Sequence, residues 1–228
     1  MLIGGLQKTT LIDYPDKVAA TIFTIGCNFR CSFCHNPAIV KGIARVISTD
    51  KILAFLASRK GLLDAVCLTG GEPTIQAGLI TFIKKIKQLG LLVKIDTNGT
   101  NPDLLEKMIE QKLIDYVAMD LKAPWASYPK VTCRLYDLAA IQKSVIILMK
   151  GAVAYEFRST VLPLLHTEEE IMEMARQIKG ADKYFLQQFR SEKKLVNDNF
   201  VNEATYTKKR LTEIVQRFQE WFKVCRVR

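Results

Sequence analysis

The sequence lacks any long uninterrupted apolar run. It contains no stretch of about 18 consecutive apolar residues, the length that a helix needs to cross a bilayer. The N-terminus has no basic stretch leading into a long apolar run, which a secretory signal would have. Internal repeats, low-complexity segments and a clear domain boundary are missing as well. These absences argue against a membrane-spanning or exported protein and predict a cytoplasmic chain.

Composition and charge fit one α/β domain. The chain has 228 residues, of which 49% are apolar, enough for a sizeable core. The formal net charge is +10, but the basic residues are spread along the chain with little aromatic interleaving. Such diffuse charge argues against nucleic-acid binding and suits docking to an acidic protein partner.

Half of the six cysteines lie in one short segment. Cys27, Cys31 and Cys34 are separated by three and then two residues, directly after an apolar run. Clustered cysteines in a cytosolic chain indicate metal binding or catalysis more than disulfides. The others are scattered and have no assigned role, although the first of them is expected in the core: Cys67, Cys133 and Cys225.

The three thiolates are one ligand short of a closed four-ligand site. An iron–sulfur cluster held by them would keep one iron open to a ligand that is not protein. The alternative is a closed Cys₃His zinc site that includes the adjacent His35. Because four ligands within nine residues would be cramped, the spacing favours a cluster, with zinc as the alternative.

Strand-like and helix-like segments alternate along the chain. Six nearly continuous apolar runs are predicted as strands: 18–25, 65–69, 91–96, 116–121, 155–161 and 183–189. Runs of this kind are typical of parallel strands covered on both faces. Six βα units with right-handed crossovers predict a TIM-like partial (β/α)6 barrel or a doubly wound sheet, because a closed barrel needs eight units.

The barrel is expected to fill most of the chain. Three segments are predicted: an N-terminal extension at 1–16, the barrel at 17–190, and a linker with a terminal helix at 191–228. Asn101 before a proline, and Thr167 in a capping box with Glu170, are signals for helix starts. Further helices are predicted at 48–58, 76–88, 137–149 and 207–223.

The motifs that can carry chemistry fall at the ends of the predicted strands. After the cysteines they are Thr69-Gly-Gly-Glu-Pro73, Asp96-Thr-Asn-Gly99, Asp120-Leu-Lys122 and, within the fifth strand, Arg158. In α/β barrels and open sheets, sites form at the carboxyl ends of the strands. The motifs are therefore expected to meet on one rim.

Each motif also has a plain structural interpretation. Segment 70–73 is either a turn or a place where backbone approaches a ligand and the glutamate accepts from an ammonium group. Asp96 either caps a helix or binds a ribose hydroxyl. Asp120 and Lys122 form either a surface ion pair or a cavity wall, and Arg158 is either a barrel arginine or the partner of a ligand carboxylate. Taken together, these residues describe a site for a zwitterionic nucleoside beside a cluster.

The cysteine loop resembles the signature of the radical S-adenosylmethionine superfamily, Cys-x3-Cys-x-aromatic-Cys, with Phe33 at the aromatic position. The resemblance covers roughly residues 15–190. It implies a partial (β/α)6 barrel in a single domain and one [4Fe–4S] cluster on Cys27, Cys31 and Cys34, with S-adenosylmethionine on the open iron. It also implies reductive cleavage of that cofactor to a 5′-deoxyadenosyl radical, with no catalytic side chain beyond cluster and cofactor.

Within the superfamily, Thr-Gly-Gly-Glu-Pro, Asp-Thr-Asn-Gly and Met-Asp-Leu-Lys are similar to motifs of the glycyl radical enzyme activating enzymes. The opening Gly-Gly-Leu-Gln-Lys-Thr-Thr-Leu-Ile-Asp-Tyr-Pro is similar to the activators of anaerobic ribonucleoside-triphosphate reductase. The resemblance implies an oxidoreductase that generates a glycyl radical on that partner under anaerobic conditions, with flavodoxin or ferredoxin as electron donor.

The resemblance also implies roles for the rim residues. Those expected to face the methionine amino group are Gly70, Gly71 and Glu72. Those expected around a monovalent cation near the methionine carboxylate are Asp96, Thr97 and Asp120. Those expected to contact the cofactor elsewhere are Lys122, Arg158 and, near the adenine, Phe33.

Two departures from the family pattern refine these expectations. About 35 residues separate Cys34 from Gly70, and the cysteine among them, Cys67, lies in a predicted strand, so a single cluster is expected. Arg190 stands where the pyruvate formate-lyase activase has a histidine, which leaves its role open and argues against pyruvate formate-lyase as partner. Two alternatives remain: a radical enzyme acting on a small molecule, such as 7-carboxy-7-deazaguanine synthase, and a non-enzymatic Cys₃His zinc-binding module.

Overall fold

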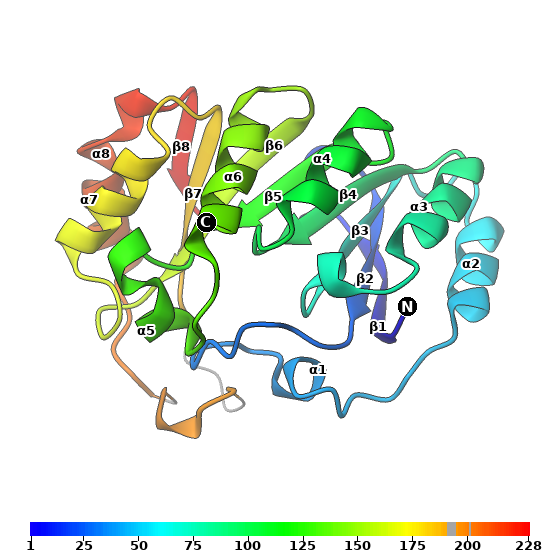
Figure 1. The fold of residues 1–228 in the computed structure, drawn as a ribbon, viewed down its shortest axis with the longest axis horizontal. Coiled ribbons are helices and arrows are strands. Elements are labelled where there is room, and N and C mark those ends of the chain that lie inside the picture. The colour runs from blue at the N-terminus through cyan, green and yellow to red at the C-terminus, as the bar shows by residue number, and fades with distance from the viewer. Residues whose placement is uncertain (191–194, 201) are drawn as a thin grey trace.

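The computed structural model describes residues 1–190, 195–200 and 202–228 (Figure 1). These residues form one sheet of eight strands, in which strands consecutive in sequence are neighbours in space. The strands are β1 (Ile3–Thr10), β2 (Ala19–Thr24), β3 (Ala65–Gly70), β4 (Leu92–Thr97), β5 (Tyr116–Asp120), β6 (Ala154–Val161), β7 (Lys183–Gln188) and β8 (Val224–Val227). β1 is antiparallel to β2, and every later pair is parallel.

Helices lie in the crossovers between the parallel strands, and most of them cover one face of the sheet, whereas α1 lies in the loop beyond the strand ends (Figure 1). They are α1 (Pro37–Val40), α2 (Thr49–Ser58), α3 (Leu79–Gln88), α4 (Pro102–Glu110), α5 (Tyr128–Thr132), α6 (Leu138–Met149), α7 (Glu168–Gln177) and α8 (Lys208–Gln216). This repeated βα order is that of an α/β partial barrel. The predicted fold class is therefore confirmed.

The six predicted strands are present as β2 to β7, and each end differs from the prediction by at most one residue. Their central side chains are fully buried, as in Leu68, Ile95, Val117 and Phe157. Strands buried on both faces need apolar side chains at successive positions, which is why their sequence signal is clear.

The helix-start signals are also confirmed. The Asn101 side chain accepts from the backbone N–H of Leu104 at the start of α4. Thr167 and Glu170 form a complete capping box at the start of α7. These bonds satisfy backbone groups that the first turn of a helix leaves without an intrahelical partner.

Both ends of the chain add strands that the sequence reasoning missed. In the N-terminal segment, β1 pairs with β2 and places Ile3 in the core. The predicted terminal helix at 207–223 is wrong in its second half, because α8 ends at Gln216 and the chain then forms β8 beside β7. β8 is short and mixed in polarity, and the contacts that hold it are far away in sequence, so no local pattern marked it.

The described part of the chain contains no helix that is long and apolar enough to cross a membrane.

Candidate functional site

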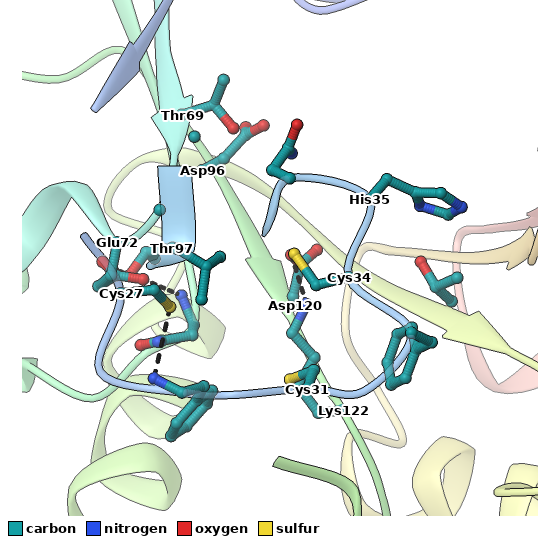
Figure 2. Close-up of a pocket in the computed structure, with 18 residues that line it drawn as sticks. Cys27, Cys31, Cys34, His35, Thr69, Glu72, Asp96, Thr97, Asp120 and Lys122 are labelled. Atoms are coloured by element: carbon teal, nitrogen blue, oxygen red, sulfur yellow. Dashed lines mark hydrogen bonds and ion pairs between the residues drawn. The ribbon is translucent and has the colours of Figure 1, made fainter. Parts of the chain in front are cut away.

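A pocket of about 210 Å³ lies at the carboxyl ends of the parallel strands (Figure 2). Its walls come from the loop after β2, from the ends of β3, β4 and β5, and from Thr160 of β6. The structure therefore brings together the motifs that were expected to share one rim. The predicted site residues that line it are Cys27, Cys31, Phe33, Cys34, Gly70, Gly71, Glu72, Asp96, Thr97, Asp120 and Lys122.

Arg158 is the one predicted site residue that does not line the pocket. Its guanidinium lies behind the rim, where Nε donates to Asp120 (2.9 Å) and Nη1 donates to Asp96 (3.3 Å). Its position in the middle of β6, rather than at the strand end, accounts for this. Arg158 therefore supports the two carboxylates from below.

The loop that carries the cysteines is held in a fixed path over the strand ends. The Arg30 guanidinium donates to the backbone carbonyls of Cys27 (2.5 Å) and Phe29 (2.7 Å). At the far end of the loop, the Cys34 carbonyl accepts from the backbone N–H of Val196 (3.0 Å). All three thiols line the pocket in this arrangement.

Asn28 fastens the start of the cysteine loop to the segment after β4. Its amide nitrogen donates to the Thr100 hydroxyl (2.7 Å), and its amide oxygen accepts from Asn98 (2.8 Å). Sequence reasoning missed these positions. The signal for Asn98 was available, because it lies inside the motif that begins at Asp96.

Burial keeps the metal-free thiols of Cys27 and Cys31 protonated near neutral pH. It raises the pKa of Cys27 to about 11 and that of Cys31 to about 12. A hydrogen bond from the Phe29 backbone N–H to Cys27 Sγ (3.4 Å) and the charge of Lys122 act in the opposite direction. Metal binding at these thiols must therefore release protons.

The Gly70–Gly71 pair has a packing role that the sequence reasoning did not assign to it. A Cβ on Gly71 would lie 1.8 Å from the carbonyl oxygen of Gly26, and Gly70 has φ of +108°. The next residue, Glu72, donates its backbone N–H to the same Gly26 carbonyl (2.9 Å). The two glycines therefore let β3 end directly against the backbone that leads into Cys27.

Glu72 is a buried carboxylate with an ordered set of partners. One oxygen, Oε1, accepts from the Thr74 backbone N–H (3.0 Å), the Thr74 hydroxyl (2.6 Å) and the Thr97 hydroxyl (2.8 Å). The other, Oε2, accepts from the Asn98 backbone N–H (2.7 Å). Burial raises the pKa of Glu72, and these bonds oppose the rise. A carboxylate has about four acceptor sites, so Oε2 retains capacity for a ligand donor.

Asp96 and Asp120 form a charged rim together with the cations beside them. Asp96 Oδ1 accepts from Lys94 Nζ (2.5 Å), and Asp120 Oδ2 accepts from Lys122 Nζ (3.0 Å). Burial acts to raise both carboxyl pKa values, but the neighbouring cations outweigh it, Arg158 most of all. They lower the pKa of Asp96 and bring that of Asp120 to about 2. Both carboxylates are therefore ionised at neutral pH.

Lys94 was not among the predicted site residues. It lies two residues before Asp96 on β4, so the alternation of a strand places both side chains on one face. That signal was present in the sequence.

His166 was also missed, and no local signal for it existed. Its Nε2–H donates to the carbonyl of Lys122 (2.8 Å), which is 44 residues away in sequence, and its Nδ1 accepts from the Leu162 N–H (3.4 Å).

His35 is engaged away from the thiols. Its Nε2 lies 2.6 Å from the Arg190 carbonyl oxygen, and its ring stacks on Phe189 with centroids 5.4 Å apart. In Figure 2 the His35 ring points away from Cys34. The arrangement therefore disfavours the Cys₃His zinc site.

A family model of the Radical SAM superfamily matches residues 21–178. The chain belongs to the radical SAM superfamily. A Methanocaldococcus jannaschii protein, named provisionally as a glycyl-radical enzyme activating enzyme, is 38% identical over 82% of this chain and 80% of its own length. A second protein of that organism with the same provisional name is 33% identical over 54% of this chain and 46% of its own length. Within the radical SAM superfamily, the chain therefore belongs to the glycyl-radical enzyme activating group.

Solved radical SAM structures share the fold. SuiB of Streptococcus suis bound to S-adenosylmethionine superposes with a TM-score of 0.69 at 14% identity, covering 90% of this chain. The chain spans about half the length of SuiB (48%) and of the second Methanocaldococcus relative (46%). At this identity the likeness to SuiB establishes the fold alone.

The residues of the pocket fit the cofactors that membership in the radical SAM superfamily implies, a [4Fe–4S] cluster and S-adenosylmethionine. Cys27, Cys31 and Cys34 line one pocket, and Lys122 is close enough to the Cys31 and Cys34 thiols to interact with them electrostatically. An N–H donor to a cysteine sulfur, as at Cys27, is a means by which proteins tune such clusters. The donor set is therefore that of a cluster with three thiolate ligands.

Proposed function

We propose that this chain activates anaerobic ribonucleoside-triphosphate reductase by generating a glycyl radical on it, with one [4Fe–4S] cluster and S-adenosylmethionine as cofactors. The observation that carries the proposal is the pocket itself, where three thiols and a charged rim meet at the strand ends. The Methanocaldococcus relative, which matches most of the chain, supports activation of a glycyl radical enzyme over chemistry on a small molecule such as a deazaguanine precursor.

Different side chains of the pocket would bind the cluster and orient S-adenosylmethionine. Cys27, Cys31 and Cys34 would hold the cluster, and the two cofactors when bound supply reductive cleavage of the sulfonium and the 5′-deoxyadenosyl radical. Glu72 Oε2 offers an acceptor for the methionine ammonium group. Lys122 offers a cation for its carboxylate, since it lines the pocket and is held by Asp120.

Phe33 is proposed to form the wall against the adenine. It lines the pocket and packs edge-on against His166 and Phe189, with ring centroids 6.2 and 6.3 Å apart. Because both neighbouring rings fix it, Phe33 presents a rigid apolar surface, which suits a stacked or edge-on base.

The monovalent cation expected beside Asp96 and Asp120 does not fit the donor set. Each of the four carboxylate oxygens already faces a protein cation, with the pairs formed by Lys94, Lys122 and Arg158. A metal ion would have to displace one of these groups. We therefore assign no metal to this part of the rim.

The choice of the reductase as partner rests on the opening segment. Within it, Tyr14 is buried against Tyr116, and Asp13 accepts a hydrogen bond from Thr21 (2.5 Å). Leu11 and Ile12 are 72% and 85% exposed, so this segment also offers an apolar surface to a protein partner. The net charge of +10 favours an acidic docking face on the reductase, and the electron donor is proposed to be a flavodoxin or ferredoxin.

The test is anaerobic. The reconstituted chain, a low-potential reductant, S-adenosylmethionine and the reductase from the same cell are mixed and read by electron paramagnetic resonance. A glycyl doublet on the reductase is expected, and none with the Cys31→Ala variant. Cofactor cleavage without a doublet on this reductase, but with one on another glycyl radical enzyme, would reject the partner and keep the enzyme class.

A further inference from the structure

Lys94 is a fully buried lysine that projects into the barrel beneath the rim, with 1% of its surface exposed. We propose that its ammonium group is a built-in cation for Asp96, which makes the rim independent of any monovalent metal ion. Lys94 is then a positioning residue for the carboxylates of the site. This goes beyond the proposed function, on which only one of the measurements below depends.

The contacts of Lys94 leave its charge one strong partner. On the neighbouring strands, Cys67 of β3 and Tyr116 of β5 are its register partners. Nζ lies 2.5 Å from Asp96 Oδ1 and 3.7 Å from Cys67 Sγ. Burial raises the pKa of Cys67, so this thiol is neutral and does not balance the ammonium charge. Because an unpaired buried ammonium is strongly unfavourable, Lys94 and Asp96 must stay together.

Ion pairs connect Lys94 and Asp96 to the other charged residues of the rim. Arg158 bridges the two carboxylates, through Nη1 to Asp96 (3.3 Å) and through Nε to Asp120 (2.9 Å). Lys122 Nζ pairs with the second oxygen of Asp120 (3.0 Å). Within the described residues, this connected network has three cations and two carboxylates, which gives a net charge of +1. A further metal cation is therefore opposed by charge as well as by the filled oxygens.

Only some members of the network face the pocket. Asp96, Asp120 and Lys122 line the pocket, while Lys94 and Arg158 are outside its lining. Lys122 is therefore the cation of the network that a ligand carboxylate can meet, and Asp120 sets its position (3.0 Å). A site built in this way needs no ion from solution to be ready, because its counter-charges are covalently attached.

The experiment uses the full chain after anaerobic cluster reconstitution, and compares wild type with Lys94→Met, Lys94→Arg and Lys143→Met. Lys143 pairs with Asp103 on the exposed surface and serves as the control for loss of one lysine charge. Thermal melts are recorded in potassium, sodium and tetramethylammonium chloride at equal ionic strength. Tetramethylammonium carries the same charge but is too bulky to enter a buried carboxylate site.

We expect the melting temperature of wild type, Lys94→Arg and Lys143→Met to be the same in the three salts. Lys94→Met should melt lower in tetramethylammonium chloride, with roughly half of the loss recovered in potassium or sodium chloride. A wild-type melting temperature that depends on potassium or sodium would overturn the proposal. So would a folded Lys94→Met variant that melts alike in all three salts.

Two further readouts keep the outcome clear. Crystals of the wild type soaked in rubidium chloride should show no anomalous peak between Asp96 and Asp120, and a peak there refutes the proposal even if Lys94→Met does not fold. Equilibrium binding of S-adenosylmethionine should depend on potassium only in Lys94→Met. If the cofactor binds no variant, the proposed function fails, while the melts and crystals still decide the role of Lys94.

Discussion

The two ends of the barrel interior use the same kinds of side chain for opposite purposes. At the lower end, Glu156 is 1% exposed and accepts two bonds from Arg228 (2.8 and 3.1 Å) and one from the Tyr116 hydroxyl (2.9 Å). At the upper end, two residues along β6, Arg158 holds Asp96 and Asp120 beside an open pocket. The lower pair is neutral and joins a buried carboxylate to a guanidinium that is 39% exposed, whereas the upper network lies beside the pocket and has one more cation than carboxylates. This difference separates a structural ion pair from a binding site more clearly than the presence of buried charge alone.

The largest expected effect is on stability and follows from loss of the Glu156–Arg228 pair at the lower end. Arg228→Met leaves the buried Glu156 carboxylate with one hydroxyl partner, and because the Arg228 side chain is 39% exposed, we expect a loss of about 3 kcal/mol, at the low end of the range for buried pairs. For a chain of this length that corresponds to a fall in Tm on the order of 10 °C. Calorimetry should show this fall, while cofactor cleavage well below the Tm stays within about twofold of wild type.

The matched control is Arg176→Met, which removes an exposed pair with Glu173 one helical turn away. Its Tm should change by less than about 2 °C, because exposed pairs contribute little. Equal losses in the two variants would show that the burial of Glu156 does not strengthen its pair with Arg228.

The second largest effect is on cofactor cleavage and follows from removal of the Asp120 charge at the upper end. Asp120→Asn removes the anion that fixes Lys122 and one side of Arg158, so Lys122, the cation proposed to meet the ligand, loses its position. We expect S-adenosylmethionine cleavage to fall about 100-fold, as for the loss of one preorganised electrostatic contact. The Tm should fall less than in Arg228→Met, since Arg158 keeps Asp96. A large loss of Tm with normal cleavage would contradict the contrast between the two ends.

A smaller effect should follow from Thr97→Val, which removes one hydroxyl donor to the buried Glu72 carboxylate. Loss of a hydrogen bond to a buried acceptor raises the free energy of the site by about 1–3 kcal/mol. We expect binding of S-adenosylmethionine, measured by equilibrium titration, to weaken by about tenfold. Thr160→Val is the control, because its hydroxyl lies across the pocket and bonds Gln187 (3.3 Å) rather than Glu72. Similar weakening in both variants would remove the special role of Glu72.

The smallest effect is a pH dependence. The folded-state pKa of Asp120 is about 2, below the usual value of a free aspartate, about 3.9. Its ion pairs therefore stabilise the fold fully above the unfolded pKa and lose that contribution as pH falls through the folded value. The Tm difference between wild type and Asp120→Asn should be constant from about pH 8 to 5 and shrink below about pH 4. A difference that disappears already near pH 6 would contradict the tight pairing of Asp120.

The sequence was sufficient to predict the residues that line the pocket, but not the placement of the buried cations that hold their carboxylates. Parallel strands buried on both faces have a strong local pattern, so the strand ends and the motifs that follow them could be placed together. Arg158 was assigned to the pocket because a sequence shows which face a strand residue takes but not how deep it lies. Lys94 could have been found by the same alternation that links it to Asp96.

Other features depend on contacts between distant segments. Glu156 and Arg228 are 72 residues apart, and the bond from His166 to the Lys122 carbonyl spans 44 residues. The edge strands β1 and β8 exist because a neighbouring strand is there to pair with them. Nothing local in these segments encodes such partners, so they had to be read from the structure.

The most direct test of the central claim follows a hydrogen atom. The reductase is prepared with glycine deuterated at Cα, mixed anaerobically with the reconstituted chain, reductant and S-adenosylmethionine, and the 5′-deoxyadenosine is weighed by mass spectrometry. The account predicts that 5′-deoxyadenosine gains one mass unit, and only when the reductase carries the label. Cofactor cleavage with no deuterium in 5′-deoxyadenosine, under conditions where the reductase stays radical-free, would contradict it.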